Sequence, residues 1–190
     1  MQKLLPVLFI LISTMGAAQL PGNSVSFVGL NSHYVTVPDA SSSIVNNTMT
    51  IEAWVYYKCE NGTSAFNVFS KGWCGAPDWT IYVAINQQKL HLAKWRNGYN
   101  SCAGGQAHYY SDDEVIPFNT WTHIAISIDA TTASNDIKFY VNGALVPHSL
   151  ISGTDGAGWN TSTYPMLIGS SRSLANNYAK AYGNIDDLRI

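Results

Sequence analysis

Tyr82, His91 and Trp95 combine flat aromatic rings with hydrogen-bonding groups, and they lie in two segments, 79–86 and 89–96, whose residues alternate in character. In an extended segment successive side chains point to opposite faces, so these three residues lie opposite the aliphatic positions. Aromatic rings stack on the C–H faces of sugars, while hydroxyl and imidazole groups form hydrogen bonds with sugar hydroxyls. The pattern therefore predicts a carbohydrate-binding surface at Tyr82, His91 and Trp95.

Trp73 and Tyr99 form a second candidate binding site, close to the Gly-rich stretch 102–106. They follow the ends of predicted strands, and binding residues concentrate in the loops of a rigid scaffold. The same aromatic side chains could instead fill the open end of the fold, and the sequence leaves both interpretations open.

Catalytic patterns are weak in this sequence. No Ser lies in a G-x-S-x-G turn. A retaining glycosidase needs two carboxyl groups about 5–5.5 Å apart, which residues at alternate positions of one strand could provide. The acidic runs 112–114 and 186–187 consist of adjacent residues, which point to opposite faces. Tyr82, His91 and His123 could form the proton-transfer groups of a uronate lyase. We expect a non-catalytic binding module; the alternative is a polysaccharide-degrading enzyme, either hydrolase or lyase, or its appended carbohydrate-binding domain.

Four alternating segments make up much of the scaffold: 48–58, 119–130, 136–146 and 182–190. The Asn142–Gly143 pair predicts a type I′ hairpin, because both central residues of that turn adopt positive φ. Charged residues make up only 12% of the chain, and Gly, Ser, Thr and Asn are abundant, which favours strands and turns. These features predict one all-β domain, a two-sheet antiparallel β-sandwich. The predicted core positions are Ile51, Ala53, Val55, Ile81, Val83, Ile85, Leu90, Leu92, Ile124, Ile126 and Ile128.

Seven short motifs occur in order along the chain: SFVGLNSHYVTVP (26–38), TIEAWV (50–55), FSKG (69–72), WTHIAIS (121–127), FYVNG (139–143), LIG (167–169) and GNIDDLRI (183–190). In this order and spacing they resemble the laminin-G-like jelly-roll modules of the concanavalin-A-like lectin/glucanase superfamily. The resemblance extends from about residue 24 to residue 190 and implies that family's jelly-roll fold. Trp54, Trp121 and His123 occupy signature positions of the family, so we interpret them as scaffold residues.

The resemblance also implies a structural calcium ion, because many relatives hold one between the first turn and the Asp pair of the final strand. Asn31, Asp186 and Asp187 are the matching candidate ligands, and calcium prefers such oxygen ligands. Val28 stands where the family usually has an Asp, which removes one expected ligand. In the alternative interpretation, Asp187 pairs with Arg189 or with a neighbouring strand.

The N-terminal residues have the pattern of a secretory signal peptide: Lys3, an apolar run and small residues that end at Ala18. We therefore expect a signal peptide at 1–18, a lead segment at 19–23 and the jelly-roll domain at 24–190. The apolar run is too short to span a bilayer, and a net charge of −2 without a basic stripe argues against nucleic acid. The expected setting is extracellular or at a cell surface. The expected partner is a glycan or an extracellular protein. The sequence leaves open whether the chain is a module by itself or one module of a larger protein with further domains beyond residue 190.

Secretion would place Cys59, Cys74 and Cys102 in an oxidising compartment. If successive strands from residue 50 to residue 96 run in alternating directions, Cys74 and Cys102 follow neighbouring strands at the same end, and Cys59 lies at the other end. A bridge needs Cα atoms within about 7 Å, so Cys74–Cys102 is the favoured disulfide.

Export is directly testable. We expect the mature chain to begin at Gln19, and mass spectrometry of the purified natural protein should show that mass with Cys74 bonded to Cys102. Recovery of a cytoplasmic protein that retains Met1 would contradict both expectations.

Overall fold

The computed structural model describes residues 22–29, 33–39, 48–58, 65–72, 81–95, 105–131, 136–156, 158, 162–170 and 181–190. The strands within them are β1 (Val25–Val28), β2 (Val35–Val37), β3 (Thr48–Tyr57), β4 (Ala65–Lys71), β5 (Ile81–Asn86), β6 (Lys89–Trp95), β7 (Gln106–Ser111), β8 (Trp121–Asp129), β9 (Asp136–Val141), β10 (Ala144–Val146), β11 (His148–Gly153), β12 (Met166–Ile168) and β13 (Tyr182–Arg189). In this part of the chain, no helix is long and apolar enough to cross a bilayer.

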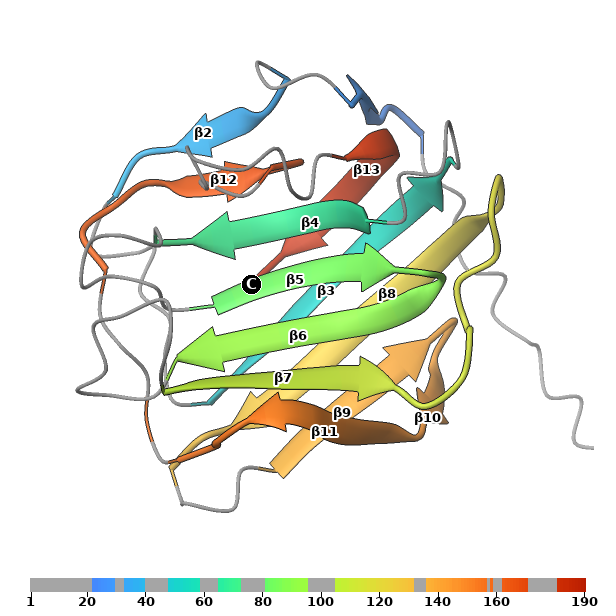
Figure 1. The fold of residues 1–190 in the computed structure, drawn as a ribbon. Coiled ribbons are helices and arrows are strands. Elements are labelled where there is room, and N and C mark those ends of the chain that lie inside the picture. Colours follow the sequence, from blue (N-terminus) through green and yellow to red (C-terminus); the bar gives the residue numbers. More distant parts are fainter. Residues whose placement is uncertain are drawn as a thin grey trace, which may run out of the picture.

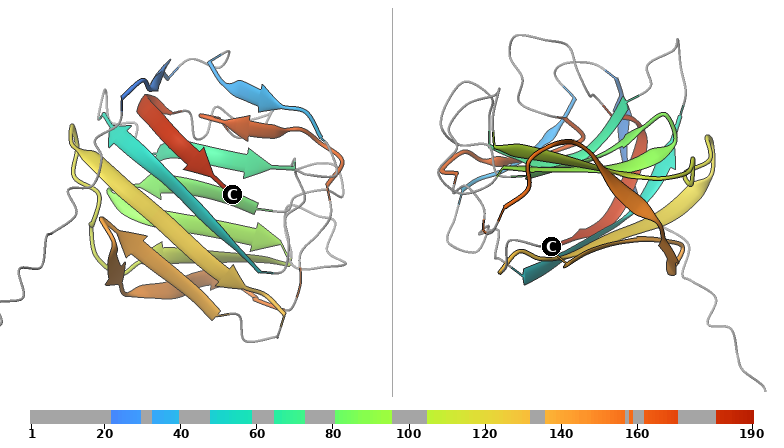
Figure 2. Two further views of the ribbon diagram at one scale, coloured as in Figure 1. Left: turned by 180° about the vertical axis from the view of Figure 1, so that it is seen from behind. Right: turned by 60° about the horizontal axis from the view of Figure 1, so that its bottom comes forward.

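The strands form two antiparallel sheets that pack face to face (Figures 1 and 2). The six-stranded sheet has the order β1-β13-β3-β8-β9-β10, and the seven-stranded sheet has the order β11-β7-β6-β5-β4-β12-β2. In Figure 1 the long strands β3, β8 and β13 run diagonally behind β4 to β7, which is the crossing that sheet twist produces. The predicted two-sheet antiparallel β-sandwich is confirmed.

The core lies between the inner faces of the two sheets. Alternation decides which side chains enter it: Ile51 pairs with Ile126 and Ala53 with Ile124, and all four are buried. Every predicted core position is buried, and each large aliphatic side chain contributes about 1.5–3 kcal/mol through its burial.

The predicted hairpin at Asn142–Gly143 is confirmed. The two residues link β9 to β10 and have φ values of 50° and 78°, as a type I′ turn requires. The turn also positions the Asn142 side chain, whose Oδ1 accepts a hydrogen bond of 3.0 Å from the main-chain N–H of His123.

Two lysines lie on the inner face at one end of the seven-stranded sheet. Lys71 and Lys94 flank Ile81 in register, and their Nζ atoms lie 2.6 Å and 2.8 Å from the carboxylates of Asp39 and Asp155. Burial lowers the pKa of Lys94, and the ion pair with Asp155 opposes that shift. Because an unpaired buried charge is costly, these contacts fix the residues that follow β2 and β11 against the sheet.

Several predicted features lie outside the described residues: the signal peptide, Asn31, Trp73, Tyr99 and the three cysteines. The premise of the disulfide argument can still be examined. Strands β4 and β6 both pair antiparallel with β5, so they run in the same direction. Their C-terminal ends, at Lys71 and Trp95, therefore lie at the same end of the sheet. The Cys74–Cys102 bridge itself stays a prediction.

Ile126 offers a direct test of the core. We expect Ile126→Ala to lower the free energy of unfolding by about 2–5 kcal/mol, because it leaves a cavity between tightly packed sheets. Urea denaturation of the purified domain measures this, with Ser127→Ala, on the outer face of the same strand, as the control. An equal effect of the two substitutions would contradict the assigned alternation.

Candidate functional site

The polar and aromatic outward-facing residues divide between two faces on opposite sides of the sandwich. Tyr82 and His91 lie on β5 and β6 of the seven-stranded sheet, whereas Trp54 and His123 pair across β3 and β8 of the six-stranded sheet. The sequence interpretation had combined Tyr82, His91 and His123 as possible groups of one lyase site, because alternation shows which residues face outward but not to which sheet a strand belongs. It follows that His123 cannot join Tyr82 and His91 in a proton-transfer trio.

On the seven-stranded sheet, the three nominated residues do lie together. The Tyr82 hydroxyl is 3.4 Å from the ring nitrogens of His91, and the Tyr82 and Trp95 ring centroids are 6.1 Å apart. The structure adds His108 and Tyr110: one His108 ring nitrogen lies 3.1 Å from His91 Nε2, and the Tyr110 ring stacks on His91 at 3.9 Å. Outward-facing and inward-facing residues alternate along 106–111, and this pattern could have identified His108 and Tyr110 as members of the same face. We call these five residues the aromatic cluster.

The aromatic cluster is closely packed and uncharged. His91 and Trp95 are only 3% and 4% exposed. Burial, reinforced by nearby His108, lowers the pKa of His91 to about 3, and burial raises the pKa of Tyr82. The half-buried Tyr82, His108 and Tyr110 are therefore the members that a ligand can reach without displacing the others.

Asn67 extends the row of Ala84 and His91 across this face. Its side chain is fully buried, and within the described part of the chain its amide nitrogen and oxygen form no hydrogen bond. Leaving such groups unpaired costs about 1–3 kcal/mol.

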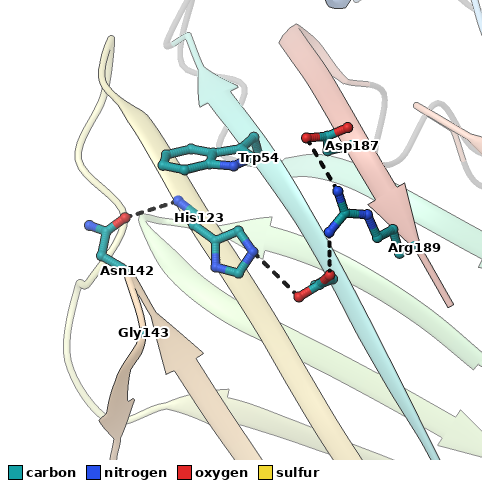
Figure 3. Close-up of a pocket in the computed structure, with 7 residues that line it drawn as sticks. Trp54, His123, Asn142, Gly143, Asp187 and Arg189 are labelled. Carbon is teal, nitrogen blue, oxygen red and sulfur yellow. Dashed lines mark hydrogen bonds and ion pairs between the residues drawn. The ribbon is translucent and has the colours of Figure 1, made fainter. Parts of the chain in front are cut away.

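The six-stranded sheet carries an open pocket of about 390 Å³ on its outer face (Figure 3). Its lining comes from β3, β8, the β9–β10 hairpin and β13. The lining residues are Glu52, Trp54, His123, Asn142, Gly143, Asp187 and Arg189. These residues come from four of the motifs on which the resemblance was based, so motifs that are distant in sequence meet at one place.

Strand register brings the pocket together. Trp54 lies opposite His123 on β8, and Glu52 lies opposite Arg189 on β13. The pairing of β13 with β3 is interrupted between Asp186 and Arg189, and Asp187 there has a φ of 48°. This bulge redirects the chain, so the Asp187 and Arg189 side chains both border the pocket.

Glu52 is the centre of the polar contacts in the pocket. Its Oε1 accepts a hydrogen bond of 3.1 Å from Arg189 Nη1, and its Oε2 lies 3.6 Å from His123 Nε2. Arg189 Nη2 lies 3.6 Å from Asp187 Oδ2, and Figure 3 shows these groups beside the Trp54 ring. The arrangement offers one indole surface surrounded by hydrogen-bonding groups. The sequence interpretation missed this site because it assigned Trp54 and His123 to the scaffold.

The two described calcium candidates, Asp186 and Asp187, already have partners within the chain. Asp186 Oδ1 accepts a hydrogen bond of 2.8 Å from the main-chain N–H of Asp187, and the Asp187 carboxylate is ion-paired with Arg189. Among the described residues, no group of three His, Cys, Asp or Glu side chains is placed to hold a metal ion. Calcium binding with Asn31 stays a prediction.

Sequence comparison identifies the family. The concanavalin A-like lectin/glucanases superfamily matches residues 29–190. The chain belongs to this superfamily. No individually curated protein matches it in sequence.

Solved structures of similar fold include three proteins that share little sequence with this superfamily member. Ruminococcus gnavus IT-sialidase CBM40 bound to α2,3-sialyllactose is 14% identical, with a TM-score of 0.56 over 73% of this chain and 72% of that one. The heptameric SAP-like pentraxin of Limulus polyphemus is 15% identical, with a TM-score of 0.57 over 87% and 74%. The ligand-binding domain of botulinum neurotoxin serotype D, in complex with N-acetylneuraminic acid, is 11% identical, with a TM-score of 0.53 over 87% and 37%. At these identities the likeness establishes the fold alone.

The buried His91 predicts acid sensitivity. Its pKa in the folded state, about 3, lies below the ordinary value of 6.5, so its contribution to stability is complete above pH 6.5 and is lost as the pH falls towards 3. The loss should approach about 1.4 kcal/mol per pH unit in that window. We expect His91→Gln to flatten the pH dependence of the free energy of unfolding, measured by urea denaturation between pH 7 and pH 4. The exposed His33, replaced in the same way, is the control, and equal slopes for the two variants would contradict the assignment.

Proposed function

We propose that this chain is a secreted, non-catalytic carbohydrate-binding module, with the Trp54 pocket as its principal ligand site. The observation that carries the proposal is the combination of a half-buried indole ring with carboxylate, amide, imidazole and guanidinium groups around one open pocket. Sugars need such a mixture, because their C–H faces are apolar and their hydroxyls require donors and acceptors.

Polar groups on several sides of the pocket can form hydrogen bonds with the hydroxyls of a sugar. Glu52 and Asp187 accept hydrogen bonds from hydroxyls, and the largely exposed Arg189 donates them. Charge-assisted hydrogen bonds of this kind are stronger than neutral ones. A single stacking ring in a shallow pocket nevertheless supports only weak affinity, on the order of micromolar to millimolar, and repeated copies would add avidity.

The comparisons support a glycan as the ligand. Two of the proteins of similar fold are described with sialyllactose or N-acetylneuraminic acid bound. The N-terminal signal pattern supports an extracellular or cell-surface setting, where a glycan or a glycosylated protein would be the partner. The aromatic cluster of the seven-stranded sheet, with Tyr82, His91 and Trp95, stays a second candidate contact surface, and so do Trp73 and Tyr99.

Glycoside hydrolysis is the alternative function, favoured by the presence of two carboxylates, Glu52 and Asp187, in one pocket. Hydrolysis requires one of the two to act as a proton donor. Both instead contact Arg189, and they come from two different strands, β3 and β13, rather than from alternate positions of one strand. This arrangement supports binding over cleavage.

Trp54 provides the decisive test. We expect Trp54→Ala to weaken glycan binding at least about tenfold, because the loss of one stacking ring removes on the order of 1–2 kcal/mol. The binders are found first on a glycan array, and isothermal titration then gives their affinities. Trp121→Ala, on the same sheet face but outside the pocket lining, is the matched control and should retain binding.

Two results would contradict the proposal. Equal binding by the Trp54→Ala variant and the wild-type chain would show that the ligand does not bind in this pocket. Release of reducing or unsaturated sugars by the purified chain, abolished by Glu52→Gln, would establish an enzyme instead.

A further inference from the structure

We infer that the Trp54 pocket selects uncharged sugars over acidic ones, such as sialylated or uronate-containing glycans, and that Glu52 sets this selectivity. The inference rests on the proposed function and adds the chemical class of its ligand. It concerns the pocket of the six-stranded sheet alone.

The formal charges of the pocket lining are the first reason. Glu52 and Asp187 each carry one formal negative charge and Arg189 carries one formal positive charge, so the carboxylate and guanidinium groups of the lining sum to −1. A ligand carboxylate would enter a site that already has more negative than positive charge, and like charges at close range repel. A neutral sugar meets no such penalty, and both protein carboxylates can accept hydrogen bonds from its hydroxyls.

The geometry of Arg189 is the second reason. Arginine binds carboxylates best through two parallel N–H groups of its planar fork. Here Nη1 donates to Glu52 at 3.1 Å and Nη2 lies 3.6 Å from Asp187, so both ends of the fork already face protein carboxylates. An acidic sugar would have to displace one of them before it could bind Arg189 in this way.

Glu52 holds this arrangement in place. One of its oxygens contacts Arg189 on β13 and the other lies near His123 on β8, so Glu52 on β3 links the strands on its two sides. Its side chain is 30% exposed, compared with 67% for Arg189. A glutamine at this position would keep the size of the side chain, remove one negative charge and release the guanidinium from its closest partner.

The experiment compares matched glycans on the same chain. The probes are neutral oligosaccharides, lactose among them, and the same oligosaccharides carrying sialic acid or a uronate, all at low ionic strength. We expect each neutral glycan that binds to bind at least about tenfold more tightly than its acidic counterpart. Tighter or equal binding of the acidic forms would overturn the inference and leave the proposed function intact. Binding of neither form would count against the proposed function and the inference together.

Glu52→Gln then tests the role of Glu52, because this substitution should improve the binding of acidic glycans relative to neutral ones. We expect the ratio of acidic to neutral glycan affinity to rise about three- to tenfold, as the pocket loses one negative charge. Asp187→Asn should act in the same direction, and asparagine tolerates the φ of 48° at this position. The control is Asp136→Asn, which makes the same charge change in an exposed ion pair with Lys138 outside the pocket. A ratio unchanged in both pocket variants, with the fold confirmed by circular dichroism, would overturn the role of Glu52.

Discussion

The register of β3 between β8 and β13 is the constraint on which the rest of the structure depends. Because side chains alternate along β3, a single alignment sends Ile51, Ala53 and Val55 into the core and Glu52 and Trp54 outward. A slip by one residue would expose the aliphatic side chains and separate Glu52 from Arg189. The hydrophobic effect that aligns the core therefore also assembles the pocket, although no pocket residue contributes much to the core.

The two outer faces use aromatic residues in different ways. On the seven-stranded sheet, His91 is stacked between neighbours and kept neutral by burial, so the aromatic cluster behaves like a second small core. On the six-stranded sheet, the rings of Trp54 and His123 meet edge to face at 5.4 Å and remain partly exposed. A partly exposed indole beside charged groups is a usual composition of a ligand-binding surface.

The polar contacts of the pocket also differ in kind from those inside the sandwich. The Lys71–Asp39 and Lys94–Asp155 pairs have buried ammonium groups, and their loss would leave a charge without solvation. The contacts of Glu52 with Arg189 and His123 are solvent-exposed, and such pairs contribute only about 0–1 kcal/mol each. The pocket can therefore vary in sequence without loss of the fold, whereas the buried pairs are tied to the architecture.

The sequence by itself determined the class of fold, the core positions and the Asn142–Gly143 turn, because alternation and positive-φ turns are local properties of the chain. It also determined that the side chains of Trp54, Tyr82 and His91 face away from the core. Only the tertiary structure decided that Trp54 and Tyr82 lie on opposite sides of the sandwich, since sheet membership depends on which strands pair. The same is true of the convergence of Glu52, His123 and Arg189: three strands separated by long stretches of sequence become neighbours only when the whole core is closed.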